Sequence, residues 1–333
     1  MRRLLYLIIV LATLFSGYWF VVAAGLDIGL GNWILARQED GWVAEYSDLS
    51  TSGFPTRFET TLKDLELADP RTGVAWSAPE FRIIAPSYRP THITAIWPHQ
   101  QTLASPYKDL TITSSTMQGL VGFGADTSLP LTKADITLDK IDIVSDNNWK
   151  VHLGQGSFTI DRDDSNPLSY AINLDAMDVS PALTLFNITD PANILPDAFE
   201  TLSIKTIIGF DAPWDRKAIE RRRPQITNLK LTILKAKWGD LDIWAAGKLT
   251  VDKEGWPTGK ITLKAKNWRE MLQIGVASGW VPPDAAPKIE QGLAIVAAFS
   301  GNPNTIDAPL GFGDHQVWLG PVPLGPAPQI RLR

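Results

Sequence analysis

Residues 133–143 read KADITLDKIDI, and this stretch decides the class of fold. Ala134, Ile136 and Leu138 alternate with charged and hydroxyl side chains, so an extended chain places the apolar groups on one face. The same period of two recurs at residues 57–67, 229–233, 241–251 and 260–266, with one slip of phase in the first of these. Strands with one apolar face are typical of antiparallel sheets that are solvated on one side. The sequence therefore predicts a body built on a curved, mostly antiparallel β-sheet.

Helices are expected mainly near the C-terminus. Asn267 is a candidate N-cap for a helix from Trp268 to about residue 278, and residues 284–299 carry apolar side chains at helical spacing. We expect these two helices to form a hairpin that packs on the sheet. Residues 180–186 open with Ser-Pro and predict a further short helix. The expected fold class is thus mainly β with a few helices.

The N-terminus indicates the compartment. Arg2 and Arg3 precede an uncharged stretch at residues 4–26, and the next charge is Asp27. About 20 apolar residues span a bilayer as a helix, and the preceding arginines keep residue 1 in the cytoplasm. The aromatic triplet at residues 18–20 would then lie at the outer interface, where Trp and Tyr are enriched. We therefore predict a transmembrane helix that precedes the β body.

Two other interpretations of this stretch stay open. Val22-Ala23-Ala24 offers a small-residue cleavage site, as in a signal peptide. A buried core helix is the third possibility, and the flanking arginines disfavour it. We favour an uncleaved anchor, because the apolar run continues past Gly17 for longer than a cleaved segment needs. Anchor and signal peptide both export the body, so we expect a single-pass inner-membrane protein with its body in the periplasm.

Three regions are expected along the chain. Residues 1–37 form the cytoplasmic tip, the anchor and a helical extension. Residues 38–180 form a first β unit, and residues 181–333 a second β unit with the helical hairpin and a Pro-rich C-terminal segment. The tetrapeptides GFPT at residues 53–56 and GWPT at residues 255–258 each precede an alternating strand. This echo favours two similar β units, and coincidence is the alternative.

Composition narrows the chemistry. The net charge of -5 argues against nucleic acid as the main partner, because phosphate binding needs a concentrated basic surface. The sequence contains no cysteine, which excludes disulfides, thiolate nucleophiles and zinc–cysteine sites. Of the four histidines only His92 and His99 lie close in sequence, and their spacing is not that of a metalloprotease. We therefore predict no catalytic residues, no metal and no cofactor, and do not expect an enzyme.

Several short runs form a more specific pattern. They are GFP at 53–55, LADP at 67–70, WSAP at 76–79, SYRP at 87–90, GWP at 255–257, NW at 267–268 and LGPVPLG at 319–325. Over nearly the whole chain this pattern resembles an uncharacterised family of alphaproteobacterial envelope proteins, a domain of unknown function. The family that it resembles carries no assigned activity or catalytic residues, so the resemblance transfers none to this chain. The strand–turn–Gly–strand texture is also similar to AsmA-like lipid-bridging proteins, which implies an anchor followed by a curved β-sheet groove.

Two functions are weighed. The first is a membrane-anchored periplasmic protein that binds or helps to move lipid or another apolar envelope component. An acyl chain buried in an apolar trough of the sheet would gain about 0.8 kcal/mol per methylene. The alternative is that the same residues form a sealed core, and that the protein is a non-catalytic envelope scaffold or protein-interaction module with other envelope proteins as partners. The candidates for lining an apolar groove are Trp76, Tyr88, Trp97 and Trp268.

Overall fold

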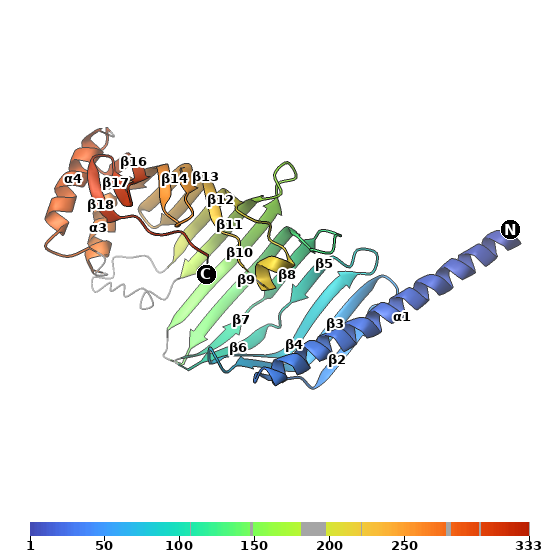
Figure 1. Ribbon diagram of the computed structural model, residues 1–333. Helices are drawn as coiled ribbons and strands as arrows, with labels where there is room; N and C mark the ends of the chain where they lie inside the picture. Colours follow the sequence, from blue (N-terminus) through green and yellow to red (C-terminus); the bar gives the residue numbers. More distant parts are fainter. Residues whose placement is uncertain are drawn as a thin grey trace. The chain divides into compact units, whose positions relative to one another are not determined.

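The computed structural model describes residues 1–106, 108–146, 149–180, 198–220, 222–277, 281–299 and 301–332 (Figure 1). It contains two compact units. The N-terminal unit comprises residues 1–123 and 136–148, and the C-terminal unit residues 124–135 and 149–333. Both units are built mainly from antiparallel strands. The N-terminal unit begins with a long apolar helix, and the C-terminal unit contains the further helices. The predicted fold class is therefore confirmed, whereas the boundaries expected at residues 37 and 180 remain predictions.

The N-terminal unit starts with helix α1 (Arg2–Glu39). Its strands are β1 (Val43–Glu45), β2 (Asp48–Ser52), β3 (Arg57–Asp69), β4 (Val74–Pro86), β5 (His92–Ile96), β6 (Gln100–Ser105), β7 (Lys108–Thr113), β8 (Thr116–Phe123) and β9 (Leu131–Ser145), of which residues 136–145 belong to this unit. Strands β1 and β2 both pair with β3, and β3 pairs with β4 along its length. Beyond β4 the sheet divides, because β4 pairs with both β5 and β6, and these pair with β8 and β7. Strand β7 in turn pairs with β9.

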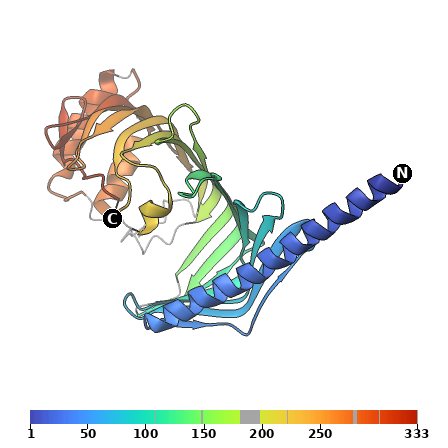
Figure 2. The ribbon, with the colours of Figure 1, turned by 45° about the vertical axis from the view of Figure 1, so that its right-hand side comes forward.

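Alternation decides which face of β3 is buried. Phe58, Thr60 and Leu62 are buried at every second position, and then Leu65 is buried after an interval of three. The predicted slip of phase therefore lies between Leu62 and Leu65. Asp64 accounts for it, because its φ of 47° is left-handed and turns the following side chain back to the same face. Helix α1 lies across this face, against β1, β2 and β3 (Figure 2).

The C-terminal unit is an antiparallel meander. Its elements are β10 (Lys150–Arg162), β11 (Ser169–Ser180), β12 (Phe199–Phe210), α2 (Arg216–Glu220), β13 (Ile226–Trp238), β14 (Leu241–Val251), β15 (Pro257–Lys266), α3 (Trp268–Ala277), α4 (Ala286–Phe299), β16 (Thr305–Gly313), β17 (Gln316–Leu319) and β18 (Val322–Pro326). Each strand from β10 to β18 pairs with the next one along the chain. Figure 2 shows that this sheet is strongly curved.

The predicted helical hairpin is confirmed as α3 and α4, which pack together, with α3 on β14 and α4 on β16. Trp268, Leu293 and Val296 are buried in a core that they share with strand residues such as Ile306 and Leu319. The backbone carbonyl of Asn267 accepts the first helical hydrogen bond from Glu270, while its side-chain amide donates to Asp240. The short helix predicted at residues 180–186 lies, from residue 181 on, outside the described residues.

The two echoed tetrapeptides occupy equivalent places. Residues 53–56 turn the hairpin from β2 to β3, and residues 255–258 lie at the turn from β14 into β15. Gly53 and Gly255 both have left-handed φ values, 98° and 88°, which only glycine adopts at little cost. The echo thus reflects a shared need for a tight turn into a strand.

Candidate functional site

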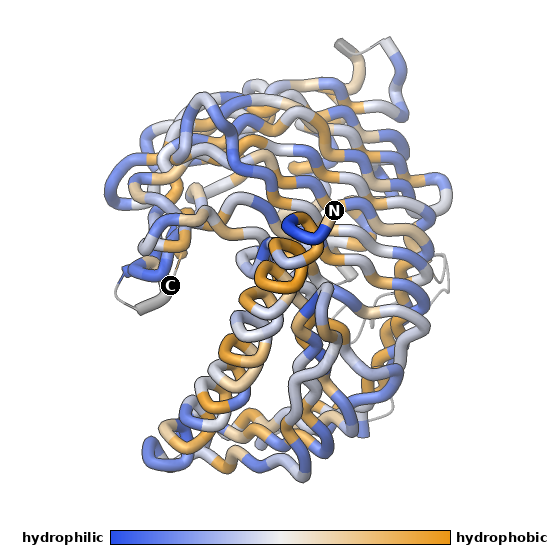
Figure 3. Tube along the Cα trace, turned by 90° about the vertical axis from the view of Figure 1, so that its right-hand side faces the viewer, coloured by the Kyte–Doolittle hydropathy of each residue, from blue (hydrophilic) through white to orange (hydrophobic). Residues whose placement is uncertain are grey.

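Helix α1 consists of two parts with different surroundings. Residues 2–17 carry large apolar side chains that are exposed, and Figure 3 shows hydrophobic residues concentrated there. From Trp19 onward the helix packs on the sheet, with Trp19, Ala23 and Ile34 buried. By length and composition α1 is a candidate membrane span. One helix therefore provides both an apolar projection and a cover for the sheet of its own unit.

An aromatic cluster fixes α1 to the sheet, formed by Tyr18, Trp19, Phe20, Phe54 and Phe58. The Trp19 ring stacks on Phe58 at a centroid distance of 5.5 Å, and its indole N–H donates to the carbonyl of the residue before Phe58 at 3.0 Å. Phe20 stacks on Phe54, also at 5.5 Å. The Tyr18 hydroxyl donates to a backbone carbonyl in the turn after β4 at 3.1 Å. Stacking and hydrogen bonds together determine where the helix meets the sheet.

A polar trio lies next along the helix and along β3. The Thr51 hydroxyl donates to the carboxylate of Asp27 at 2.6 Å and lies 2.7 Å from the hydroxyl of Thr60. Because Thr51 has a single hydroxyl proton, Thr60 is the donor in the second bond. Thr60 is buried, so its hydroxyl needs this partner. The trio ties α1 to β2 and β3 beyond the aromatic cluster.

An apolar cavity of about 290 Å³ follows between α1 and the sheet. Every residue that lines it is apolar: Leu30, Trp33, Ile34, Leu62, Leu65, Leu67, Trp76, Phe81 and Ile83. The indole N–H of Trp76 already has a partner, because it donates to the side-chain oxygen of Gln101 at 2.7 Å. The cavity therefore presents hydrocarbon and ring surface to whatever enters it.

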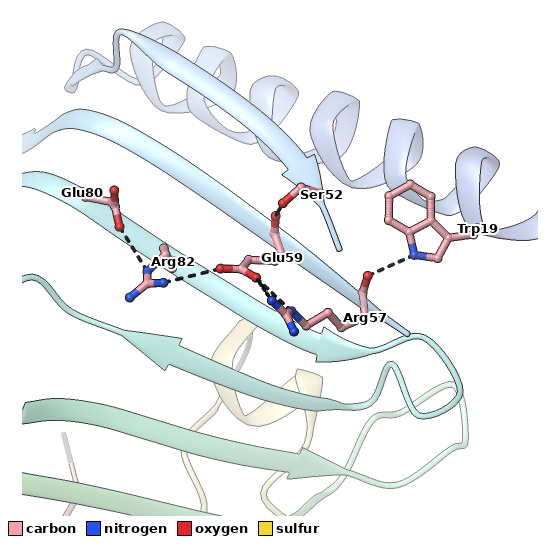
Figure 4. Close-up of polar contacts among 6 residues, drawn as sticks. All are labelled: Trp19, Ser52, Arg57, Glu59, Glu80 and Arg82. Atoms are coloured by element: carbon pink, nitrogen blue, oxygen red, sulfur yellow. Dashed lines mark hydrogen bonds and ion pairs between the residues drawn. The ribbon is translucent and has the colours of Figure 1, made fainter. Parts of the chain in front are cut away.

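The opposite face of the same strands is charged. Glu59 alternates with Phe58 and Thr60, so its side chain lies on the side of β3 away from α1. It accepts from Arg57 at 2.8 Å and pairs with Arg82 at 3.5 Å, and Arg82 pairs with Glu80 at 3.1 Å (Figure 4). Since this face carries ion pairs, the apolar surface of these strands lies on the α1 side.

The four predicted groove residues have different surroundings. Trp76 lines the cavity. The ring centroid of Trp97 lies 5.5 Å from that of Phe81, and Trp97 lines a separate depression of mixed polarity. Tyr88 is 80% exposed in the turn after β4, and Trp268 is 2% exposed in the core of the C-terminal unit. The structure thus brings Trp76 and Trp97 near each other through Phe81, whereas Tyr88 and Trp268 lie elsewhere.

Sequence reasoning did not select most of the cavity wall. Leu62, Leu65 and Leu67 are recognisable as the apolar positions of an alternating strand, but nothing local says that this face stays partly open. Leu30 and Ile34 continue the apolar pattern of the anchor, which is the one signal that α1 would cover the sheet. Nothing in the sequence indicates that Phe81 lines the cavity, because its position depends on the pairing of β4 with β3, where Phe81 lies opposite Leu62.

Three titratable groups with shifted pKa values have structural surroundings: Asp126 and Asp163 lie in turns, and Tyr170 is buried in β11. Hydrogen bonds from Ser165 hold the pKa of Asp163 below its usual value, and bonds from Ser128 do the same for the pKa of Asp126. Burial raises the pKa of Tyr170. Among the described residues, no group of three or more His, Cys, Asp or Glu side chains is arranged to hold a metal ion.

The family model for an uncharacterized protein conserved in bacteria (DUF2125) matches residues 19–328. The match starts at Trp19, which is also the first residue of α1 that is buried against the sheet. No curated protein and no solved structure is detectably similar to the chain. The predicted resemblance to an uncharacterised family is confirmed, and the chain belongs to this family of uncharacterized conserved bacterial proteins.

Proposed function

We propose that the protein is anchored in the inner membrane by α1, with its β body in the periplasm, and that the cavity beneath α1 takes up part of a lipid or of another apolar envelope component. Arg2 and Arg3 support this orientation, because positive charges flanking a span stay on the cytoplasmic side. The exposed apolar surface of residues 2–17 supports the anchor, since water would not favour it.

The observation that carries the proposal is the wholly apolar wall of the cavity. Its volume of about 290 Å³ lies near the lower end of ligand pockets, which begin at about 300 Å³. Each methylene that enters gains about 0.8 kcal/mol. Trp33 lies at the cavity and is 45% exposed, which leaves a rim through which a chain can enter. These features suit part of an acyl chain better than a polar metabolite.

The proposal is tested with a variant in which a larger side chain fills the cavity. In Leu30→Trp the added indole occupies the space beneath α1, whereas Leu35→Trp adds the same group to an exposed position of the same helix outside the cavity wall. The full-length proteins are purified in mild detergent, and bound lipid is quantified by mass spectrometry after extraction. Lipid that surrounds the anchor is equal in both variants, because residues 2–17 are unchanged.

We expect bound lipid at a fixed ratio to protein in the wild type and in Leu35→Trp, and its loss in Leu30→Trp. Equal lipid in all three proteins would refute the cavity as the binding site. Absence of bound lipid throughout would favour the scaffold function instead. The orientation is tested separately with a periplasm-dependent reporter fused to the C-terminus, and activity of a cytosol-dependent reporter there would refute it.

A further inference from the structure

The length of α1 that is free of the sheet is too short to cross a bilayer. The helix is fixed to the sheet from Tyr18 and Trp19 onward by two hydrogen bonds and ring stacking. The free residues 2–17 measure about 24 Å at 1.5 Å per residue, whereas the hydrocarbon core is about 30 Å thick. Counted from residue 4, the first after the arginines, a span of about 20 residues ends near Ala23. Ala23 is already buried on the sheet.

The far boundary of the hydrocarbon therefore falls within the part of α1 that carries the sheet. Two turns of the sheet are fixed to that part of the helix. Residues 53–56 approach it through Phe54, which contacts both Trp19 and Phe20, and residues 87–90 approach it through the carbonyl of Ser87, which accepts from Tyr18. Where the helix enters the interface, these turns must enter it too.

The exposed side chains of this end are those that an interface favours. Phe54 is 48% exposed and Tyr88 80% exposed, and Phe20 beside them is 60% exposed. Arg89 follows Tyr88 and is exposed, so its guanidinium is available to lipid phosphates. Aromatic rings with neighbouring basic groups are the usual composition of segments at the membrane–water boundary.

We propose that the end of the N-terminal unit formed by residues 53–56 and 87–90 is immersed in the outer interface of the membrane that α1 crosses. The inference rests on the anchoring part of the proposed function. It adds a second membrane contact. It also sets how far the sheet extends from the membrane, because the turn at residues 70–73 then lies about 40 Å from the turn at residues 53–56, along the 13-residue strand β3.

The absence of cysteine makes a direct test possible. Single cysteines replace Tyr88, Arg71 and Leu11 in the full chain, and each is labelled with an environment-sensitive nitrobenzoxadiazole fluorophore. The proteins are reconstituted in phosphatidylcholine–phosphatidylglycerol vesicles. Fluorescence is quenched either by lipids that carry a nitroxide on the acyl chain or by aqueous iodide. Tyr88→Cys is the informative variant, because its side chain is exposed and its loss disturbs little packing.

We expect the nitroxide lipid to quench the Tyr88→Cys probe nearly as strongly as the Leu11→Cys probe, and iodide to quench only the Arg71→Cys probe. Arg71 is the matched control, because it is also exposed in a turn but at the other end of β3. If Leu11→Cys is quenched by the nitroxide lipid while Tyr88→Cys behaves like Arg71→Cys, the docking inference is overturned and the anchor stands. If Leu11→Cys is not quenched by it, the anchor itself fails.

Discussion

Removal of the Trp19 side chain should release α1 from the sheet. Trp19 is buried, stacks on Phe58 and donates to the carbonyl of Arg57 at 3.0 Å. Its hydrogen bond contributes about 0.5–1.5 kcal/mol and its ring contacts about 0.5–1.5 kcal/mol each, to which the lost burial adds. Trp19→Ala should therefore lower the free energy of opening the N-terminal unit by about 3–5 kcal/mol, the usual range for a buried Trp.

The assay is hydrogen exchange followed by mass spectrometry in detergent micelles. A loss of 3 kcal/mol corresponds to exchange that is about 100-fold faster, since each 1.4 kcal/mol is a factor of ten. The increase should appear in β3, which Phe58 and Arg57 begin, and not in β11 of the C-terminal unit. Trp33→Ala is the matched control, because Trp33 lies on the same helix but is half exposed. Equal exchange in β3 for Trp19→Ala and Trp33→Ala would refute the reasoning.

Three further outcomes are expected. Thr51→Val removes the bond to Asp27 and should destabilise the N-terminal unit by about 1–3 kcal/mol, measured by urea unfolding. Trp268→Ala should cost about 3–5 kcal/mol and speed hydrogen exchange in α3 and α4 while leaving β3 unchanged. Ser165→Ala should raise the pKa of Asp163, followed by carboxyl ¹³C NMR. Because that pKa is lowered in the folded protein, its contribution to stability is present above the usual carboxylate pKa and is lost as the pH falls through the lowered one. The variant should lose the part of that contribution that comes from the Ser165 hydroxyl, because the backbone N–H of residue 165 still donates to Asp163, and an unchanged Asp163 pKa would contradict the prediction.

The strands with clear alternation, which are β3, β9, β13, β14 and β15, were predictable, because alternation is a local property. In β3 even the slip of phase is visible, since Leu62 and Leu65 are three residues apart where the pattern requires two or four. The slip requires a residue with a left-handed backbone between Leu62 and Leu65, and Asp64 is that residue. Pairing was not predictable in the same way. That β5 pairs with β8 across the hairpin of β6 and β7 depends on contacts distant in sequence, which no local pattern records.

The candidate site was less predictable, because the sequence does not show which aromatic side chains are buried. Trp268 and Trp76 are equally apolar in sequence, yet one is enclosed by the helical hairpin and the other borders a cavity. The difference arises from what covers each face. Tyr88 lies in the turn after β4 and is 80% exposed, so its exposure follows from its place in that turn rather than from its apolar ring.

The two units cover their apolar faces by different means, which explains why the cavity lies where it does. In the C-terminal unit two helices, α3 and α4, pack over β14 and β16, and Trp268 is buried between the helices and the sheet. Among the described residues of the N-terminal unit, α1 is the one helix that covers the face. A helix is about 10 Å wide and strands lie about 4.8 Å apart, so one helix covers about two strands. Helix α1 contacts β1, β2 and β3, and the adjacent face of β4, with Trp76 and Phe81, is left half covered. The apolar cavity therefore lies beside α1, at the part of β4 that the helix leaves half covered.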